Sequence, residues 1–478
     1  MSEDKPLLKS KEQKEDEGGA KIKVYWQRWL VLFVYCSHIM GTNIAWMSVG
    51  SIADVAECYY GVNVFWINSL SYIFLVMYTF LFAGATYFLK RFGLRWTAIL
   101  GGTFNAAGAW LRFAGSNPNY FWLLLMGQGV SSFTNVLEWS APSLMSAVWF
   151  PQNERAFATA SVGATAPQVG ILLSLFIGPL AVHDSRTDTV CNTTITIRGS
   201  ASFIEWQDKI YSQMLYYFLG QAVLATVLLP ITFMVPASPP TPPSRSRQLE
   251  DEEENDLSLL RSALILLKNK HFIFFSFVFG MYLGVAGAYV TVYDEVFNAI
   301  GYSSYQSYMG YLGLAIQLVS IGGLLAIGTW IDYTKTFYGS TVAISVSSTI
   351  AAIGLALATQ YKLDFIYLSI ICSVAVGLTV IFQGVGYEYG VEMTYPVPES
   401  ISAGIMNAFS QVTCTIMILV CSLLVKKHWS VYVYWMLAGC VAASAIVQVF
   451  VRPKLRRVEI DNPQTKKLLR KPTASIQS

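Results

Sequence analysis

The chain has 478 residues, of which 54% are hydrophobic and only 13% are charged. A soluble protein carries about 25% charged residues, so this composition excludes an ordinary soluble domain and indicates a membrane protein. The formal net charge of +3 is too small to favour nucleic-acid binding.

The first 28 residues are polar, and we expect residues 1–28 to form a cytoplasmic tail. Glu3 lies four residues before Leu7 and Leu8, a pattern that resembles the acidic dileucine signals read by sorting adaptors. It leaves an endolysosomal membrane and the plasma membrane open as locations. The first apolar segment has no small-residue cleavage site, so we interpret it as a retained span and not as a signal peptide.

Twelve apolar segments follow, each close to the roughly 20 residues that cross a bilayer as a helix. They form two sets of six, at 29–50, 64–89, 96–114, 120–148, 156–182 and 211–235, and at 272–297, 308–330, 340–360, 365–390, 401–425 and 431–451. Two six-span halves are typical of secondary transporters built from repeats. The sequence therefore predicts an all-α membrane protein with two six-helix bundles, 29–235 and 271–451.

The two halves are joined by the polar stretch 236–270, with a proline run followed by an acidic run. Such runs stay extended and solvated, so we expect a flexible cytoplasmic linker, with a regulatory docking site as the alternative. Lysine and arginine cluster in the first tail, in the loop after the second span and in the tail 452–478. By the positive-inside rule both termini are expected in the cytoplasm.

The longest loop on the other side of the membrane contains Asn192-Thr193-Thr194, a glycosylation acceptor pattern. This loop is the one that the charge rule places outside the cytoplasm, so the two signals agree. Cys58 and Cys191 fall near the same face, which leaves a disulfide open.

Four sequence blocks are more specific than the overall composition. They are residues 90–95 (Lys-Arg-Phe-Gly-Leu-Arg), 105–108 (Asn-Ala-Ala-Gly), 149–155 (Trp-Phe-Pro-Gln-Asn-Glu-Arg) and 388–399 (Glu-Tyr-Gly-Val-Glu-Met-Thr-Tyr-Pro-Val-Pro-Glu). They resemble the feline leukaemia virus subgroup C receptor-related family, solute carrier family 49 of the major facilitator superfamily. Segments 51–55 and 332–335 look closest to its less-studied third-member branch. The resemblance implies a major facilitator fold and alternating-access transport of a small organic solute such as a choline- or ethanolamine-like amine. Haem is the other association of the family.

This resemblance has one departure. Major facilitators usually place an acid before the basic residue and Phe-Gly of the second-to-third loop, whereas here that position is Lys90. Asp332 keeps an acid at the related loop of the second half, so the gating charges of the two halves are unequal.

Four residues are expected at mid-membrane depth in the helices that surround a central cavity: Trp46, Gln168, Tyr289 and Gln411. The resemblance implies that they line a choline and ethanolamine pocket. Aromatic faces bind a quaternary ammonium, and amide oxygens accept from a hydroxyl. The alternatives are that the glutamines bridge neighbouring helices and that the rings only pack in the core.

Acidic residues inside or near the spans are candidates for coupling and gating. Glu138 lies deep in the fourth span, where an ionised carboxylate costs about 2.5–3.5 kcal/mol, so it should face a cavity, pair or be protonated. It is a candidate proton-coupling acid, with a structural role as the alternative. Glu388 and Glu392 share one helix face near the cytoplasmic end of the tenth span, and we expect them and Asp332 to gate that side. Arg112 is expected to snorkel to the headgroups in preference to binding an anion.

The four histidines argue against other functions. None is predicted in the cavity or paired with an acid at catalytic spacing, so haem transport and a membrane enzyme are both disfavoured. We assign no catalytic residue, metal ligand or cofactor, and we expect a monomer whose partners are a small solute, membrane lipids and sorting adaptors. Transport of another metabolite or vitamin and a non-transporting receptor or sensor stay as alternatives.

Overall fold

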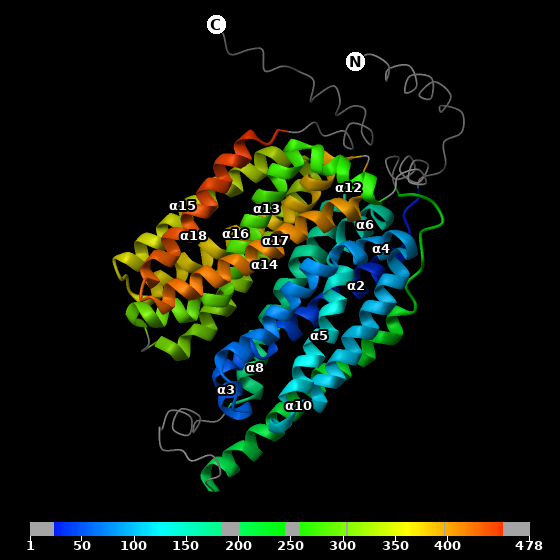
Figure 1. Ribbon diagram of the computed structural model, residues 1–478. Helices are drawn as coiled ribbons and strands as arrows, with labels where there is room; N and C mark the ends of the chain where they lie inside the picture. Colours follow the sequence, from blue (N-terminus) through cyan, green and yellow to red (C-terminus); the bar gives the residue numbers. More distant parts are fainter. Residues whose placement is uncertain (1–22, 184–200, 244–258, 303–304, 396, 453–478) are drawn as a thin grey trace, which may run out of the picture.

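The structure is a computed structural model that describes residues 23–183, 201–243, 259–302, 305–395 and 397–452. Within these ranges every regular element is a helix. Figure 1 shows two bundles, one formed by the first half of the chain and one by the second. The predicted sorting residues Glu3, Leu7 and Leu8 and the predicted glycosylation site Asn192 lie outside the described residues.

The first bundle contains a helix that is too long for one crossing. Helix α4 has 51 residues, about 75 Å at 1.5 Å per residue, which is more than twice the hydrocarbon thickness. At Gly93 the backbone leaves the helical region with φ 75° and ψ −179°, and the chain turns back there. Glycine adopts this positive φ without steric cost, so α4 provides two spans. The bundle consists of α2 (Gln27–Ser48), α3 (Ala53–Tyr60), α4 (Val64–Ala114), α5 (Phe121–Glu138), α6 (Ala141–Trp149), α7 (Arg155–Ala160), α8 (Ala166–Ala181) and α10 (Ala201–Thr232).

The second bundle has one helix for each crossing. Its members are α13 (Lys270–Phe297), α14 (Gln306–Thr334), α15 (Phe337–Gln360), α16 (Phe365–Thr394), α17 (Glu399–Lys426) and α18 (Ser430–Phe450). Ten helical segments of the described residues are long and apolar enough to span a membrane. One of them holds the two spans of α4, and α5 with α6 adds a further crossing, which gives the predicted twelve.

The linker differs from the prediction at its end, where α12 (Leu259–Lys268) forms a helix. Leucine, alanine and lysine favour helix, and the segment buries Leu266 while Leu264 stays exposed. Helix α12 packs against α13 and α17. We call the face that carries α12 and the end of α18 the tail face, and the face that carries α3 the opposite face (Figure 1).

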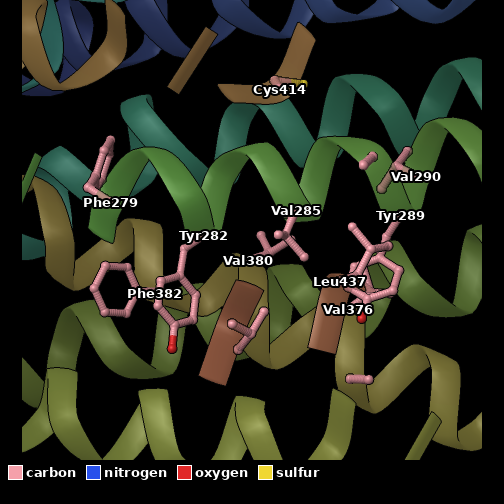
Figure 2. Close-up of a cluster of buried hydrophobic side chains, with 14 of the residues drawn as sticks. Phe279, Tyr282, Val285, Tyr289, Val290, Val376, Val380, Phe382, Cys414 and Leu437 are labelled. Carbon is pink, nitrogen blue, oxygen red and sulfur yellow. The ribbon is translucent and has the colours of Figure 1, made fainter. Parts of the chain in front are cut away.

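The second bundle is built around α13, which is buried on most sides. Tyr282 stacks on Phe382 with ring centroids 4.1 Å apart, and Figure 2 shows this pair within a larger apolar cluster. The cluster also includes Ile171 and Leu175 of α8, so the core continues across the boundary between the bundles.

Candidate functional site

A cavity lies between the bundles and takes its walls from both of them. Helices α2, α4, α5 and α8 contribute from the first half, and α13, α16 and α17 contribute from the second. The cavity holds about 840 Å³, including open solvent. Its position between two packed bundles is that of a midplane site in a transporter with repeated halves.

The walls of this central cavity are polar but uncharged. None of the lining residues within the described ranges is Asp, Glu, Lys or Arg. Three aromatic rings face it, those of Trp46, Phe74 and Trp139, and five amide side chains contribute, those of Asn43, Asn135, Gln168, Gln383 and Gln411. A ligand here would meet rings and dipoles and no ionic partner.

Five polar atoms of the cavity walls have no hydrogen-bond partner within the described part of the chain. They are the indole Nε1 atoms of Trp46 and Trp139 and the amide oxygens of Asn135, Gln168 and Gln411. A buried polar group without a partner costs about 1–3 kcal/mol, and native structures contain few of them. Their concentration in one cavity indicates a site for a ligand that donates and accepts hydrogen bonds.

Two other amides of the cavity have their donors already engaged. Asn43 Nδ2 donates to the carbonyl of Ile39 at 2.8 Å within its own helix. Gln383 Nε2 donates to the carbonyl of Gly163 at 2.8 Å, across the boundary between the bundles. Gly163 lies in a π-helical turn, Ser161–Thr165, between α7 and α8. Such turns displace backbone carbonyls from the regular ladder, and they often occur at functional sites.

Three of the four predicted substrate contacts line this cavity, but Tyr289 does not. Tyr289 has 0% of its surface exposed and stacks on Tyr434, with ring centroids 5.9 Å apart. It belongs to the buried cluster drawn in Figure 2 with Val376 and Leu437. The prediction for this residue is corrected because α13 turns a different face, with Ala286 and Val290, toward the cavity.

Comparison with known proteins decides the family. A model of the Major Facilitator Superfamily matches residues 31–388, three quarters of the chain. The chain belongs to the major facilitator superfamily. This major facilitator is therefore an integral multi-pass membrane transporter and not an enzyme.

Solved structures of other major facilitators share its fold. FucP in the outward conformation matches with a TM-score of 0.68 and 12% identity, over 90% of this chain and 100% of that one. The proton:xylose symporter XylE matches with a TM-score of 0.61 and 14% identity, over 90% and 98%. At these identities the likeness concerns the fold alone.

Curated relatives point to a narrower group. The choline/ethanolamine transporter FLVCR2 of Rattus norvegicus is 28% identical over 451 residues, covering 93% of this chain and 78% of that protein. The choline/ethanolamine transporter FLVCR1 of Mus musculus is 28% identical, covering 81% and 68%. An uncharacterized MFS-type transporter of Caenorhabditis elegans, C09D4.1, is 25% identical, covering 96% and 74%. The major facilitator is thus related to FLVCR1 and FLVCR2.

Glu138 does not face the central cavity of this major facilitator. Its Oε1 lies 2.8 Å from Nδ1 of His38, and Nε2 of His38 lies 2.9 Å from Oγ1 of Thr232. The prediction that no histidine pairs with an acid is therefore wrong for His38. Both side chains are buried, at 0% and 2% exposure. Gly101 makes room for the carboxylate, because a Cβ there would lie 2.0 Å from Glu138 Oε1.

Asp332 ties the second bundle to the first at the tail face. Its carboxylate oxygens accept from the backbone N–H groups of Ala156 at 2.9 Å and Phe157 at 2.6 Å, in the first turn of α7. Lys335 lies 3.2 Å from the same carboxylate and donates to the carbonyl of Gln152 at 2.6 Å. A carboxylate at a helix N-terminus is stabilised by the orphan N–H groups and by the helix dipole.

Glu388 and Glu392 lie beside this contact. Thr159 Oγ1 donates a hydrogen bond to Glu388 Oε1, again across the bundles. The two glutamates, Asp332 and Arg155 line one small cavity at the tail face. Closer to the central cavity, Asn407 Nδ2 donates to the carbonyl of Trp139 at 2.7 Å. These contacts join the bundles in the half of the protein next to the tail face.

Proposed function

We propose that this major facilitator transports a small choline- or ethanolamine-like amine by alternating access, with the central cavity as its binding site. The observation that carries the proposal is an uncharged cavity between the bundles that combines two indole rings with unpartnered amide oxygens from both halves. The relatives named as choline/ethanolamine transporters support the same substrate class.

The chemistry of the walls fits such an amine. A quaternary ammonium has no N–H to donate, and aromatic faces hold it at about 0.5–2 kcal/mol each, depending on desolvation. The oxygens of Asn135, Gln168 and Gln411 are acceptors for the hydroxyl of choline or for the ammonium of ethanolamine. Haem fits less well, because the described lining contains neither a histidine ligand nor a cation for its carboxylates.

We infer that the tail face is cytoplasmic. The basic residues of both tails support this orientation, and so does Cys58 of α3 on the opposite face, which is disulfide-bonded. Disulfides persist in oxidising compartments. We further propose that Glu3, Leu7 and Leu8 direct a monomeric protein to endolysosomal membranes, that Asn192 is glycosylated, and that the chain belongs to the third-member branch.

The contacts of Asp332 and Glu388 with the first bundle must open before the cavity reaches the cytoplasm, so we propose that these two residues, with Glu392 beside them, gate that side. Glu138 with His38 is our candidate for proton coupling, acting through the packing of α2, α5 and α10. Uptake driven by an imposed pH gradient, compared between the wild type and Glu138→Gln, tests this assignment. An equal response of the two proteins would remove Glu138 from the coupling mechanism.

The substrate proposal is tested by uptake of radiolabelled choline and ethanolamine into proteoliposomes. Gln168→Ala and Gln411→Ala each remove one acceptor, worth about 1–1.5 kcal/mol, so KM should rise roughly tenfold. Tyr289→Phe is the matched control, because its hydroxyl has no partner and lies away from the cavity. Unchanged uptake by both glutamine variants would refute the pocket. Absence of flux for the wild type across a broad panel of solutes would favour a sensor.

A further inference from the structure

A second cavity opens on the side of the first bundle, between α2, α8 and α10. It holds about 920 Å³, including open solvent, and shares no lining residue with the central cavity. Two of its lining residues, Ile177 and Leu224, are each 44% exposed, so it opens to the lateral surface that faces lipid in a membrane. We call it the lateral cavity.

A buried cation lies directly behind the lateral cavity. Arg112, in the last turn of α4, is only 2% exposed, so the prediction that it snorkels to the headgroups is wrong. Its side chain passes against α5 at Gly127, where a Cβ would lie 2.7 Å from Arg112 Cγ. Nη1 donates to Oε1 of Gln221 at 2.8 Å, and Gln221 lines the lateral cavity.

Arg112 lacks a counterion among the residues that the structure describes. Its one hydrogen-bond partner there is the neutral amide of Gln221, and its Nε has none. An uncompensated buried charge is penalised by several kcal/mol, so the surroundings of Arg112 favour the arrival of an anion. The positive potential reaches the lateral cavity through Gln221 and Tyr217, which line it.

The walls next to Arg112 offer hydrogen-bond donors. Because Gln221 Oε1 is taken by Arg112, its amide presents Nε2, which has no partner in the described chain. Ser174 Oγ likewise makes no close bond, and the hydroxyl of Tyr217 lies beside Ser174, Ser51 and Gln221 and makes a long bond of 3.5 Å to the carbonyl of Ser48. Donors backed by a cation suit a group with several anionic oxygens, above all a phosphate.

The polar end of the lateral cavity lies toward the opposite face, within reach of a lipid that inserts from that side. Arg112 lies 19 residues beyond the turn at Gly93, about 28 Å along the helix, which is close to the full hydrocarbon thickness of about 30 Å. The polar end therefore lies in the half of the membrane next to the opposite face. Gln213, eight residues before Gln221 on α10 and about 12 Å from it along the helix, is nearer that face, where it bonds the backbone of His183 just after α8 ends. Leu173, Ile177 and Leu224 supply an apolar wall for an acyl chain.

We propose that the lateral cavity binds a membrane phospholipid, with its headgroup phosphate held by Gln221, Ser174 and Tyr217 under the charge of Arg112. Arg112 acts as a positioning residue, because it holds the amide of Gln221 and supplies charge without lining the cavity. The site is independent of the central cavity and of the amine proposed there.

Native mass spectrometry of the purified protein, titrated with dioleoylphosphatidylglycerol, dioleoylphosphatidylcholine or dioleoylglycerol, tests the site. We expect one copy of either phospholipid to bind and dioleoylglycerol, which has no phosphate, to bind at least tenfold more weakly. Arg112→Gln should lose the bound phospholipid, and Arg112→Lys should retain part of it because the charge remains. Equal binding of dioleoylglycerol by the wild type would overturn the role of the phosphate.

Gly220→Phe keeps the test decisive if Arg112→Gln does not fold. Gly220 lines the lateral cavity, and a Cβ there would meet no atom within 4 Å, so the ring can fill the space without a clash. Gly439→Phe is the matched control, at another exposed glycine with open space, in α18. Phospholipid should be lost from the first variant and kept by the second; retention by Gly220→Phe would refute the site. Displacement of lipid by millimolar inorganic phosphate would overturn the lipid as occupant in favour of a soluble anion.

Discussion

The contact of Asp332 with α7 is expected to hold the tail face closed, and Asp332→Ala removes it. The carboxylate makes two charge-assisted bonds to backbone N–H groups across the bundles. Such bonds contribute about 1.5–3 kcal/mol each, and the helix dipole adds about 0.3–1 kcal/mol. The pair with Lys335 is partly exposed and adds at most about 1 kcal/mol.

Part of this energy is offset, because water solvates Asp332 and the N–H groups once the face opens. We therefore expect Asp332→Ala to reduce the free energy that favours the closed tail face by about 3 kcal/mol. This corresponds to a shift of roughly 100-fold in the ratio of closed to open protein. Asp332→Asn should give an intermediate shift, because an amide oxygen accepts one of the two N–H groups without charge assistance.

Electron paramagnetic resonance measures this shift as the distance between nitroxides at Asn153 and Tyr333, exposed positions on the two bundles next to the contact. The wild type should show mainly the short distance, and Asp332→Ala should populate a longer one. Thr334→Ala is the matched control, since Thr334 Oγ1 donates within its own helix to Trp330. An unchanged distance distribution for Asp332→Ala would show that other contacts close this face.

Two further predictions concern stability. His38→Leu leaves Glu138 buried without its partner and should lower the free energy of unfolding by about 3–5 kcal/mol. The double variant His38→Leu with Glu138→Met should recover most of this loss. Steric trapping in bicelles measures both free energies, and a double variant as unstable as His38→Leu would contradict the pairing. Gly108→Ala should destabilise by at least about 1–3 kcal/mol because its Cβ would lie 2.6 Å from the backbone nitrogen of Ser131, while Gly84→Ala, with open space, should be near neutral in thermal melts.

The membrane spans were predictable because segments that cross the hydrocarbon region must be apolar in composition. Long apolar stretches fix which residues cross the bilayer, and the predicted segments match the helices to within a few residues at most ends. The exception is the sixth span, where α10 begins at Ala201, ten residues before the predicted start, because its first turns are polar and extend beyond the apolar stretch. Composition gives no sign of such an extension.

The direction in which a side chain points was less predictable than its depth. Helix α13 is apolar on all sides, so its sequence does not say that Val290 faces the cavity while Tyr289, one residue earlier, faces the core. The same ambiguity hid Asn135 and Trp139, although their four-residue spacing places both on one face of the fourth span. His38 and Glu138 are 100 residues apart, and only the packing of α2 against α5 brings them together.

The binding free energy that the uncharged cavity can supply is similar in size to the free energy of the contact that closes the charged tail face. Two indole faces at about 0.5–2 kcal/mol each and a few amide bonds at about 0.5–1.5 kcal/mol each give a substrate only several kcal/mol of binding. A ligand shifts a conformational equilibrium by no more than its difference in affinity for the two states. The closing contact of about 3 kcal/mol at Asp332 is within that range, so binding of the proposed amine can help to open it. A carboxylate in the cavity would bind this proposed substrate more tightly but would also retain it after opening, so the neutral walls favour its release.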